Sequence, residues 1–297
     1  MSMTRMWLVG VAVIVSTLTA LLAFVAFPPT AQANHSWNGY HWARTSTSNS
    51  FTLPLGDNVT AAWDSYLAAA SGPAQPYPAD PSPTFTSTND WSDSSVLDTT
   101  IVAGGTTRKR CRPTSGRVEV CNYTYGTNGW LGLAQIWLSG SHIVQGTTKV
   151  NDSYFNTATY NQPAWRHLVM CQEVGHTFGL DHQDETKTNA NLGTCMDYTN
   201  DPDGGAGGAS ATDPTNEQPN QHDYDQLASI YTHTDLRTTV SSTSAASALP
   251  PAANRGSFNS RAEWGRKLRE SRDGQLELFV RDFGSGAKLF TWVIAAS

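Results

Sequence analysis

The pattern of apolar positions along the chain predicts a domain that mixes strands and helices. Segments rich in β-branched and aromatic residues are separated by turns that contain glycine, as is typical of strands. The predicted strands comprise residues 40–43, 95–103, 117–125, 130–138 and 142–151. Apolar residues recur instead at helical spacing in residues 57–70 and 221–231. A further helix is predicted to begin near Pro163, because proline is favoured in the first turn of a helix.

The N-terminus has the pattern of a targeting segment. Arg5 precedes an apolar run at residues 6–27, and Ala31 and Ala33 then fit the recognition pattern of a signal peptidase. Residues 1–33 are therefore predicted to be a signal peptide, and after its removal we expect a secreted protein with no stable membrane insertion. The alternative is a retained N-terminal membrane anchor, since the apolar run approaches the ~20 residues needed to cross a bilayer.

The C-terminal part of the chain differs in composition from the predicted main domain, residues 34–237. Residues 238–260 are rich in Ser, Ala, Pro and Thr and are predicted to be a linker. Residues 261–297 mix charged and apolar residues and predict a small β hairpin or sheet. So short a segment buries little core alone, so we expect it to pack on the main domain or on a partner.

The charge of the chain narrows the classes of partner. The formal net charge is −6 at pH 7, which gives no reason to expect nucleic-acid binding. The basic run at residues 108–110 is short, and we interpret it as an exposed hairpin tip. Residues 201–220 are rich in Gly, Asp and Pro and are interpreted as a mobile surface loop. The alternative is a Ca²⁺ site formed by Asp201, Asp203 and Asp213.

The most informative segment begins at Gln172 and reads Gln-Glu-x-x-His-x-x-Gly-x-x-His. On a helix, Gln172 and His176 lie four residues apart on one face, where two side chains can hold one metal ion. Glu173 stands beside them, close enough to take a proton from a metal-bound water. Gly179 marks the end of the helix, because glycine enters the left-handed conformation without a steric penalty. The turn that follows is expected to bring His182 towards the same ion.

This segment resembles the zinc motif of the metzincins, which are secreted zinc endopeptidases, except that they have histidine at the position of Gln172. Downstream, Met196 followed two residues later by Tyr198 resembles their Met-turn. The resemblance implies an α+β fold with a twisted, mixed or mainly antiparallel sheet, an active-site helix, and a loop-rich lower half that ends in a helix. It also implies one catalytic Zn²⁺ ion and a polypeptide substrate, and we expect a monomer.

The resemblance assigns roles to individual residues. His176 and His182 are the predicted zinc ligands, completed by Gln172 or Tyr198, and Glu173 is the predicted general base. An amide oxygen is a weaker zinc donor than an imidazole nitrogen, so we expect looser metal binding than in a three-histidine site. In astacins and serralysins the equivalent tyrosine reaches the metal or the developing oxyanion, which implies a catalytic role for Tyr198. Met196 is expected to form a hydrophobic floor under the site. Other histidines show no pattern, although the fold could bring one of them to the metal; they are His35, His41, His142, His222 and His233.

Cysteine usage agrees with export. The chain has four cysteines, an even set that predicts two disulfides in an oxidising compartment. Cys111 and Cys121 flank a turn signal and are predicted to close a hairpin. Cys171 immediately precedes the motif and Cys195 immediately precedes Met196, so a bond between them would join the Met-turn to the helix.

Three classes of function are compatible with these residues. The first is a secreted zinc endopeptidase that hydrolyses peptide bonds with metal-activated water and Glu173 as general base. The second is a catalytically silent binding protein on the same scaffold, which the presence of Gln172 favours. The third is a zinc hydrolase acting on non-peptide bonds, which no residue specifically favours. Glu173 favours the first class, because a silent site needs no carboxylate that faces the metal.

Overall fold

The computed structural model of the chain describes residues 35–72, 90–205, 210, 212–243 and 249–296. The predicted signal peptide, residues 1–33, lies outside the described residues. Residues 33–297 belong to one unit, whose described part is discussed below. Within that described part, no helix is long and apolar enough to cross a membrane.

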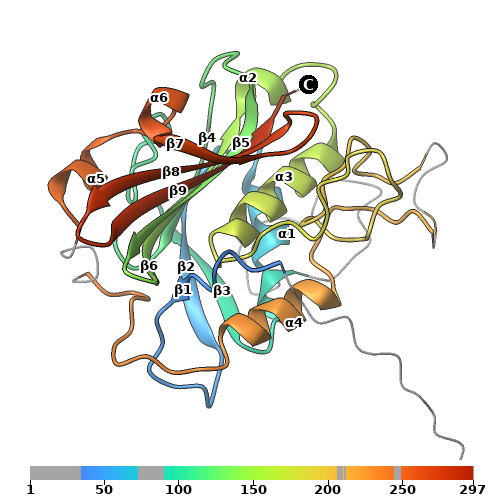
Figure 1. The fold of residues 1–297 in the computed structure, drawn as a ribbon. Coiled ribbons are helices and arrows are strands. Elements are labelled where there is room, and N and C mark those ends of the chain that lie inside the picture. The colour runs from blue at the N-terminus through green and yellow to red at the C-terminus, as the bar shows by residue number, and fades with distance from the viewer. Residues whose placement is uncertain (1–34, 73–89, 206–209, 211, 244–248, 297) are drawn as a thin grey trace, which may run out of the picture. The chain divides into compact units, whose positions relative to one another are not determined.

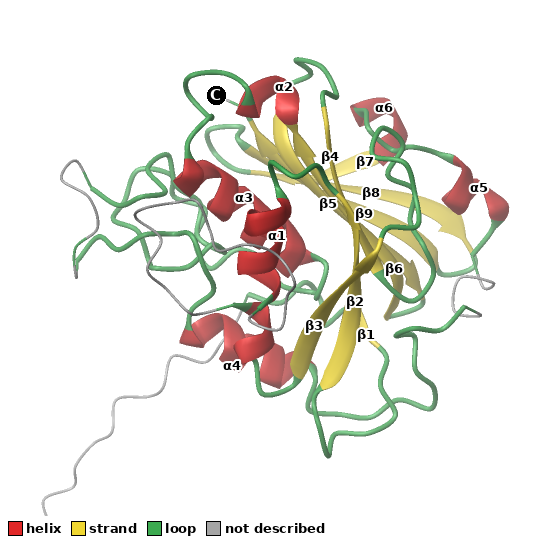
Figure 2. Cartoon of the chain, turned by 180° about the vertical axis from the view of Figure 1, so that it is seen from behind, coloured by secondary structure: helices red, strands yellow, loops and turns green. Residues whose placement is uncertain are grey.

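A nine-stranded mixed sheet forms the centre of this unit (Figures 1 and 2). Its strands are β1 His41–Trp42, β2 Phe51–Asn58, β3 Leu97–Ala103, β4 Val118–Tyr123, β5 Trp130–Ser139, β6 His142–Asn151, β7 Arg266–Glu270, β8 Leu276–Gly284 and β9 Ala287–Ala295. Their order is β3-β2-β4-β6-β5-β9-β8-β7, and β1 also pairs with β6. Strands β1, β2, β3, β4 and β6 pair in parallel, whereas β5 is antiparallel to both β6 and β9. The predicted α+β class with a mixed sheet is therefore confirmed.

The C-terminal segment continues the main sheet and is not a separate layer. Strand β9 pairs with β5 along its whole length, from Trp130 opposite Ala295 to Ser139 opposite Ala287. Strands β8 and β7 follow in antiparallel order. The expectation that residues 261–297 pack on the main domain is thus confirmed.

Helices cover both faces of the sheet (Figure 1). They are α1 Asp64–Ser71, α2 Asp152–Phe155, α3 Pro163–His176, α4 Gln221–Ile230, α5 Pro251–Arg255 and α6 Arg261–Trp264, with a 3-10 turn at Trp91–Asp93. Helix α3 packs on β5, β6 and α1, while α5 and α6 pack on β9. Alternate residues of β9 face opposite sides of the sheet and enter different cores. Phe290 and Trp292 join the core under α3. Leu289 and Val293 join the core under α5 and α6. Coverage of both faces explains why β9 is apolar at successive positions.

The predicted helix at residues 57–70 is wrong in its first half. Strand β2 runs to Asn58, and α1 begins only at Asp64. The Asp57 carboxylate accepts a hydrogen bond from the Val59 backbone N–H at 2.9 Å, a local bond that competes with helix formation. Strand β2 was not predicted because it contains a proline and a glycine, both of which are disfavoured inside a sheet.

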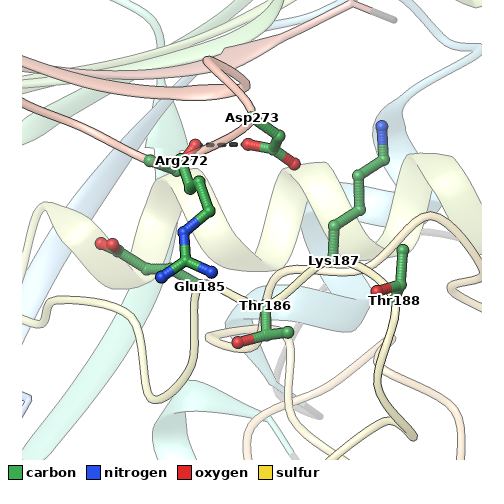
Figure 3. A pocket seen from close by; sticks show the side chains of 7 residues that line it. Glu185, Thr186, Lys187, Thr188, Arg272 and Asp273 are labelled. Atoms are coloured by element: carbon green, nitrogen blue, oxygen red, sulfur yellow. Dashed lines mark hydrogen bonds between the residues drawn. The ribbon is translucent and has the colours of Figure 1, made fainter.

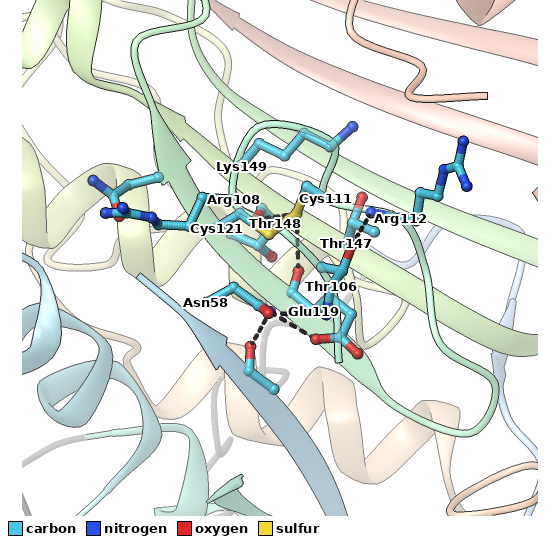
Figure 4. The surroundings of a disulfide bond; sticks show 12 residues. Asn58, Thr106, Arg108, Cys111, Arg112, Glu119, Cys121, Thr147, Thr148 and Lys149 are labelled. Atoms are coloured by element: carbon cyan, nitrogen blue, oxygen red, sulfur yellow. Dashed lines mark hydrogen bonds between the residues drawn. A yellow bond between two sulfur atoms is a disulfide. The ribbon is translucent and has the colours of Figure 1, made fainter. Parts of the chain in front are cut away.

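The predicted disulfide between Cys111 and Cys121 is present, but the expected hairpin is wrong (Figure 4). Residues 104–117 form a loop, and β4, which contains Cys121, pairs in parallel with β2 and β6. The disulfide therefore fastens this loop, with its exposed basic run at residues 108–110, onto a central strand. The reason for the error is that a turn signal does not show whether both flanking segments become strands.

Candidate functional site

Helix α3 carries the first part of the candidate site. Gln172, Glu173 and His176 lie in its C-terminal turns, and all three side chains are buried. The chain then turns at Gly179, whose φ of +97° confirms the left-handed conformation predicted for it. This turn brings His182 back, so that its Nε2 atom lies 3.1 Å from Nε2 of His176.

Replacing Gly179 by alanine is expected to destabilise the fold. A Cβ at this position would overlap the carbonyl oxygen of Tyr40, in addition to being held at positive φ. We expect the free energy of unfolding to fall by at least about 2 kcal/mol, measured by urea denaturation. Gly126→Ala is the matched control, because Gly126 has a φ of +96° and no atom within 4 Å of its Cβ position. An equal loss in both variants would contradict a specific role for the contact with Tyr40.

The Nε2 atoms of the two histidines face each other. Nδ1 of His176 lies 2.9 Å from the carbonyl oxygen of Leu180, which can only accept, so Nδ1 is the protonated atom and Nε2 keeps its lone pair. Burial lowers the pKa of His176 well below its usual range, and the neighbouring His182 lowers it further. The separation of 3.1 Å between the Nε2 atoms is close to the ~3.3 Å expected between ligand atoms of a tetrahedral zinc ion.

Two buried oxygen atoms on α3 are unsatisfied. The side-chain Nε2 of Gln172 donates to the carbonyl oxygens of Cys195 at 2.6 Å and Asp197 at 3.4 Å. These bonds fix the amide, while its Oε1 atom has no hydrogen-bond partner among the described residues. The same holds for Oε2 of Glu173, and burial raises the pKa of this carboxyl well above its usual range. Buried polar atoms are rarely left unpaired, so two imidazoles and an amide oxygen fit a cation that is ligated at this place.

The turn at Met196 packs directly against α3. Met196 is fully buried, and a Cβ on Gly175 of the helix would lie 2.7 Å from its Sδ atom. The predicted disulfide between Cys171 and Cys195 is present and joins the same helix and turn. The structure therefore places the predicted floor residue against the helix that carries the candidate ligands.

Tyr198 is directed towards the C-terminal segment. Its hydroxyl donates to the side-chain oxygen of Gln275 at 3.4 Å, and its side chain is buried. Burial also raises the pKa of the phenol, which is neutral at pH 7. The role of Tyr198 at the metal stays a prediction.

Two carboxylates that the motif does not specify lie beside His182. Oδ1 of Asp181 and Oε1 of Glu185 are 3.6 Å and 3.8 Å from its Nδ1 atom. Both pair with the guanidinium of Arg269 on β7, at 2.5 Å and 2.9 Å. Neither carboxylate is within hydrogen-bond distance of Nδ1, which has no hydrogen-bond partner among the described residues, so both act on the ring through their charge. Their closeness to His182 in the sequence was a usable signal, whereas nothing in the sequence indicates Arg269.

The C-terminal strands cover the two histidines. Trp292 of β9 stacks on His176, with ring centroids 5.2 Å apart and an interplanar angle of 11°. The cavity at His182, which residues of β7, β8 and β9 enclose, has a volume of about 10 Å³. Such a cavity holds roughly one water molecule. A polypeptide therefore has no access to the histidines in this arrangement.

An open cleft adjoins the covered site at Glu185 (Figure 3). Its volume is about 480 Å³, and it lies between the loop that follows His182 and the turn that joins β7 to β8. The residues that line it are Glu185, Thr186, Lys187, Thr188, Ser271, Arg272 and Asp273. Because one wall belongs to the C-terminal segment, displacement of that segment would widen the cleft towards His182.

The described acidic residues of the 201–220 loop lie outside the two groups of close potential metal ligands. Across the described residues, ligand atoms of at least three His, Cys, Asp or Glu side chains come within 4.8 Å of one another at two places. These groups are Asp181, His182 and Glu185, and His41, His233 and Asp235. Neither includes Asp201, Asp203 or Asp213, although Asp203 and Asp213 lie near enough to Asp201 to raise the pKa of its carboxyl, after desolvation by burial. The Ca²⁺ alternative stays a prediction.

Comparison with known proteins assigns the chain to no family. No model of a protein family matches the chain, and no curated protein matches it. The resemblance to the metzincins therefore rests on the motif that begins at Gln172 and on the Met196 turn.

Proposed function

We propose that the protein is a secreted zinc endopeptidase that its own C-terminal strands hold in a closed form. The observation that carries this proposal is the approach of the His176 and His182 Nε2 atoms to 3.1 Å at the end of a helix that also bears Glu173. The unpaired, buried Oε1 atom of Gln172 supports it, because an amide oxygen is a competent third donor.

Each residue has a defined task in peptide hydrolysis. His176, His182 and Gln172 hold the ion, and zinc, when bound, supplies the Lewis acidity that lets water attack a peptide carbonyl near neutral pH. Glu173 accepts the proton of the attacking water at its carboxylate and returns it to the leaving amine. The raised pKa that burial gives this carboxyl makes its carboxylate a stronger base, which favours the first transfer.

The position of β9 explains why the closed form is inactive. Without β9, β5 would be the edge of the sheet, and an exposed edge strand binds extended peptides through main-chain hydrogen bonds. Strand β9 takes this place and puts Trp292 over His176. Activation therefore requires that the C-terminal strands leave β5.

The alternative is a catalytically silent binding protein. Gln172 in place of a histidine favours it, and so does the burial of both histidine side chains. The two proposals differ in whether the uncovered site cleaves polypeptides, and both allow zinc to be present.

Zinc analysis of the mature protein tests the metal site. We expect the variant with His176→Ala and His182→Ala to contain one zinc ion per chain fewer than the wild type, measured by mass spectrometry of the metal. His167→Ala is the control, because His167 is also buried on α3 but lies outside the motif. Equal zinc content in the double variant and the wild type would contradict the proposed metal site.

A further inference from the structure

A buried lysine that the proposed peptidase does not use lies on the face of the sheet that α5 and α6 cover. Lys149 of β6 is opposite Leu133 of β5, which belongs to the core under these helices. The Nζ atom of Lys149 donates to Oε1 of Gln135 at 2.9 Å, to the carbonyl oxygen of Ser257 at 2.6 Å and to Oδ1 of Asn259 at 2.9 Å. All three partners are uncharged, and the lysine is fully buried.

The surroundings of Lys149 favour the neutral amine over the ammonium. Burial lowers the pKa of Lys149 to about 7, although the charge of Glu263 opposes this effect. A large fraction of the side chain is therefore neutral near pH 7. A neutral, desolvated lysine amine is a nucleophile. It also has only two hydrogen atoms for three nearby acceptors, so one of these oxygens faces its lone pair.

The segment that faces Lys149 is held in an unusual backbone conformation. Phe258 is buried and has a φ of +49°, which is costly for a bulky residue. Its carbonyl oxygen accepts from Nε2 of Gln135 at 3.0 Å and from Nε1 of Trp264 at 2.8 Å. Such a conformation persists only where the surrounding structure fixes it. The core and these two bonds therefore fix the position of the next residue, Asn259.

The two ends of the Asn259 carboxamide have different environments. Its Oδ1 atom is in contact with the buried Nζ of Lys149, whereas its Nδ2 atom donates to the carbonyl oxygen of Lys109 at 3.4 Å. Lys109 belongs to the exposed basic run at residues 108–110. The carbonyl group thus lies beside the amine, and the amide nitrogen lies towards the surface of the protein.

We propose that Lys149 and Asn259 form an intramolecular isopeptide bond. The Nζ atom attacks Cγ of Asn259, the new C–N bond forms, and the bond from Cγ to Nδ2 breaks. One proton passes from Nζ to Nδ2, which leaves as ammonia. The step exchanges one amide for another and needs no oxidant and no second reactant. A distance of 2.9 Å from Nζ to Oδ1 places the amine next to Cγ, and a fixed approach of this kind replaces an encounter in solution.

Glu263 is the carboxylate that serves this reaction. Its Oε2 atom accepts from the backbone N–H of Asn259 at 3.0 Å and from the hydroxyl of Ser260 at 3.1 Å. Its charge also acts on Lys149. Glu263 carries the proton from Nζ to the departing Nδ2, and transfer by a positioned side chain typically accelerates a reaction by about 10²–10⁴-fold.

The bond would attach the C-terminal segment to the main sheet at the start of that segment. It would join β6 to the loop between α5 and α6, which precedes β7, β8 and β9. These strands could leave β5 and still remain attached to the protein, even after proteolysis between α4 and Asn259. The proposal does not depend on zinc or on the proposed peptidase.

The intact mass of the mature protein, with its disulfides reduced, tests the proposal. We expect a mass about 17 Da below that of the sequence, which is the mass of one ammonia, and no such loss in Lys149→Met or Asn259→Ala. A digest of the wild type should contain a branched peptide that joins positions 149 and 259. Asn254→Ala is the matched control, because Oδ1 of Asn254 also accepts from a side chain of β6, Nε2 of Gln145 at 2.8 Å. This variant should lose ammonia as the wild type does.

The branched peptide of the wild type decides the question even if a variant fails to fold. A wild type with the full sequence mass would overturn the proposal, and so would a mass loss that persists in Lys149→Met. Glu263→Gln should lose ammonia at least about 10²-fold more slowly, followed by intact mass over days. An unchanged rate in this variant would overturn the role given to Glu263. Protein stripped of zinc should show the same bond, so the result is separate from that of the zinc analysis.

Discussion

Replacing Trp292 by alanine is expected to raise the cleavage rate of an unfolded polypeptide by about 10²-fold. The indole is 2% exposed and stacks on His176, so it is buried only while β9 stays on β5. Truncating a buried tryptophan costs about 3–5 kcal/mol. This cost falls on the closed form alone, because in the open form the side chain is already in water. Since about 1.4 kcal/mol is a factor of ten, a minor open fraction should grow by at least about 10²-fold.

Trp63→Ala is the matched control for this experiment. Trp63 is fully buried and packs on Phe155 of α2, so the variant loses comparable packing without a change at β9. Initial rates of hydrolysis give the activity, and hydrogen exchange of β9 shows independently whether the strand has opened. An equal rise in both variants would indicate general loosening and not removal of a cover. An opened β9 with no cleavage would favour the silent binding protein.

The candidate metal site could be predicted because its residues are close in sequence. The spacing from Gln172 to His176 follows from helix geometry, and the return of His182 follows from one glycine turn. The structure gives Gly179 the expected positive φ and brings the two imidazoles together. The bond between Cys171 and Cys195 could be predicted for a related reason, since each cysteine adjoins a recognisable motif.

The covering of the two motif histidines by β9 and the contact between His142 and Asp235 could not be predicted, because both depend on non-local pairing. The strand pattern in residues 261–297 predicts that the segment pairs with the edge of a sheet. It does not predict which edge the segment pairs with, or the register of the pairing. The pairing of Ser139 with Ala287 is set by the whole sheet. In the same way, His142 and Asp235 meet only because β1, β6 and the segment after α4 converge, and no spacing in the sequence indicates this.

Glu173→Gln is expected to abolish cleavage once the site is open. In the Trp292→Ala background, the rate should fall by about 10²–10⁴-fold, which is the usual contribution of a general base. Glutamine keeps the size of the side chain and its place on α3 but does not accept the proton of the attacking water. The Oε2 atom of Glu173 has no hydrogen-bond partner among the described residues, so the substitution breaks no bond of that atom that holds the fold. Zinc content and Tm should therefore stay unchanged.

Glu185→Gln in the same background separates proton transfer from positioning. The Glu185 carboxylate lies 3.8 Å from the Nδ1 atom of His182, and its negative charge stabilises a cation held by that ring, so its loss should weaken zinc binding by about 10–100-fold. At saturating zinc this variant should recover most of its activity, whereas Glu173→Gln should not. Equal cleavage with Glu and Gln at position 173 would contradict the mechanism, because the proton would then have another acceptor. A zinc-dependent rescue of Glu173→Gln would instead make Glu173 a residue that positions the ligands.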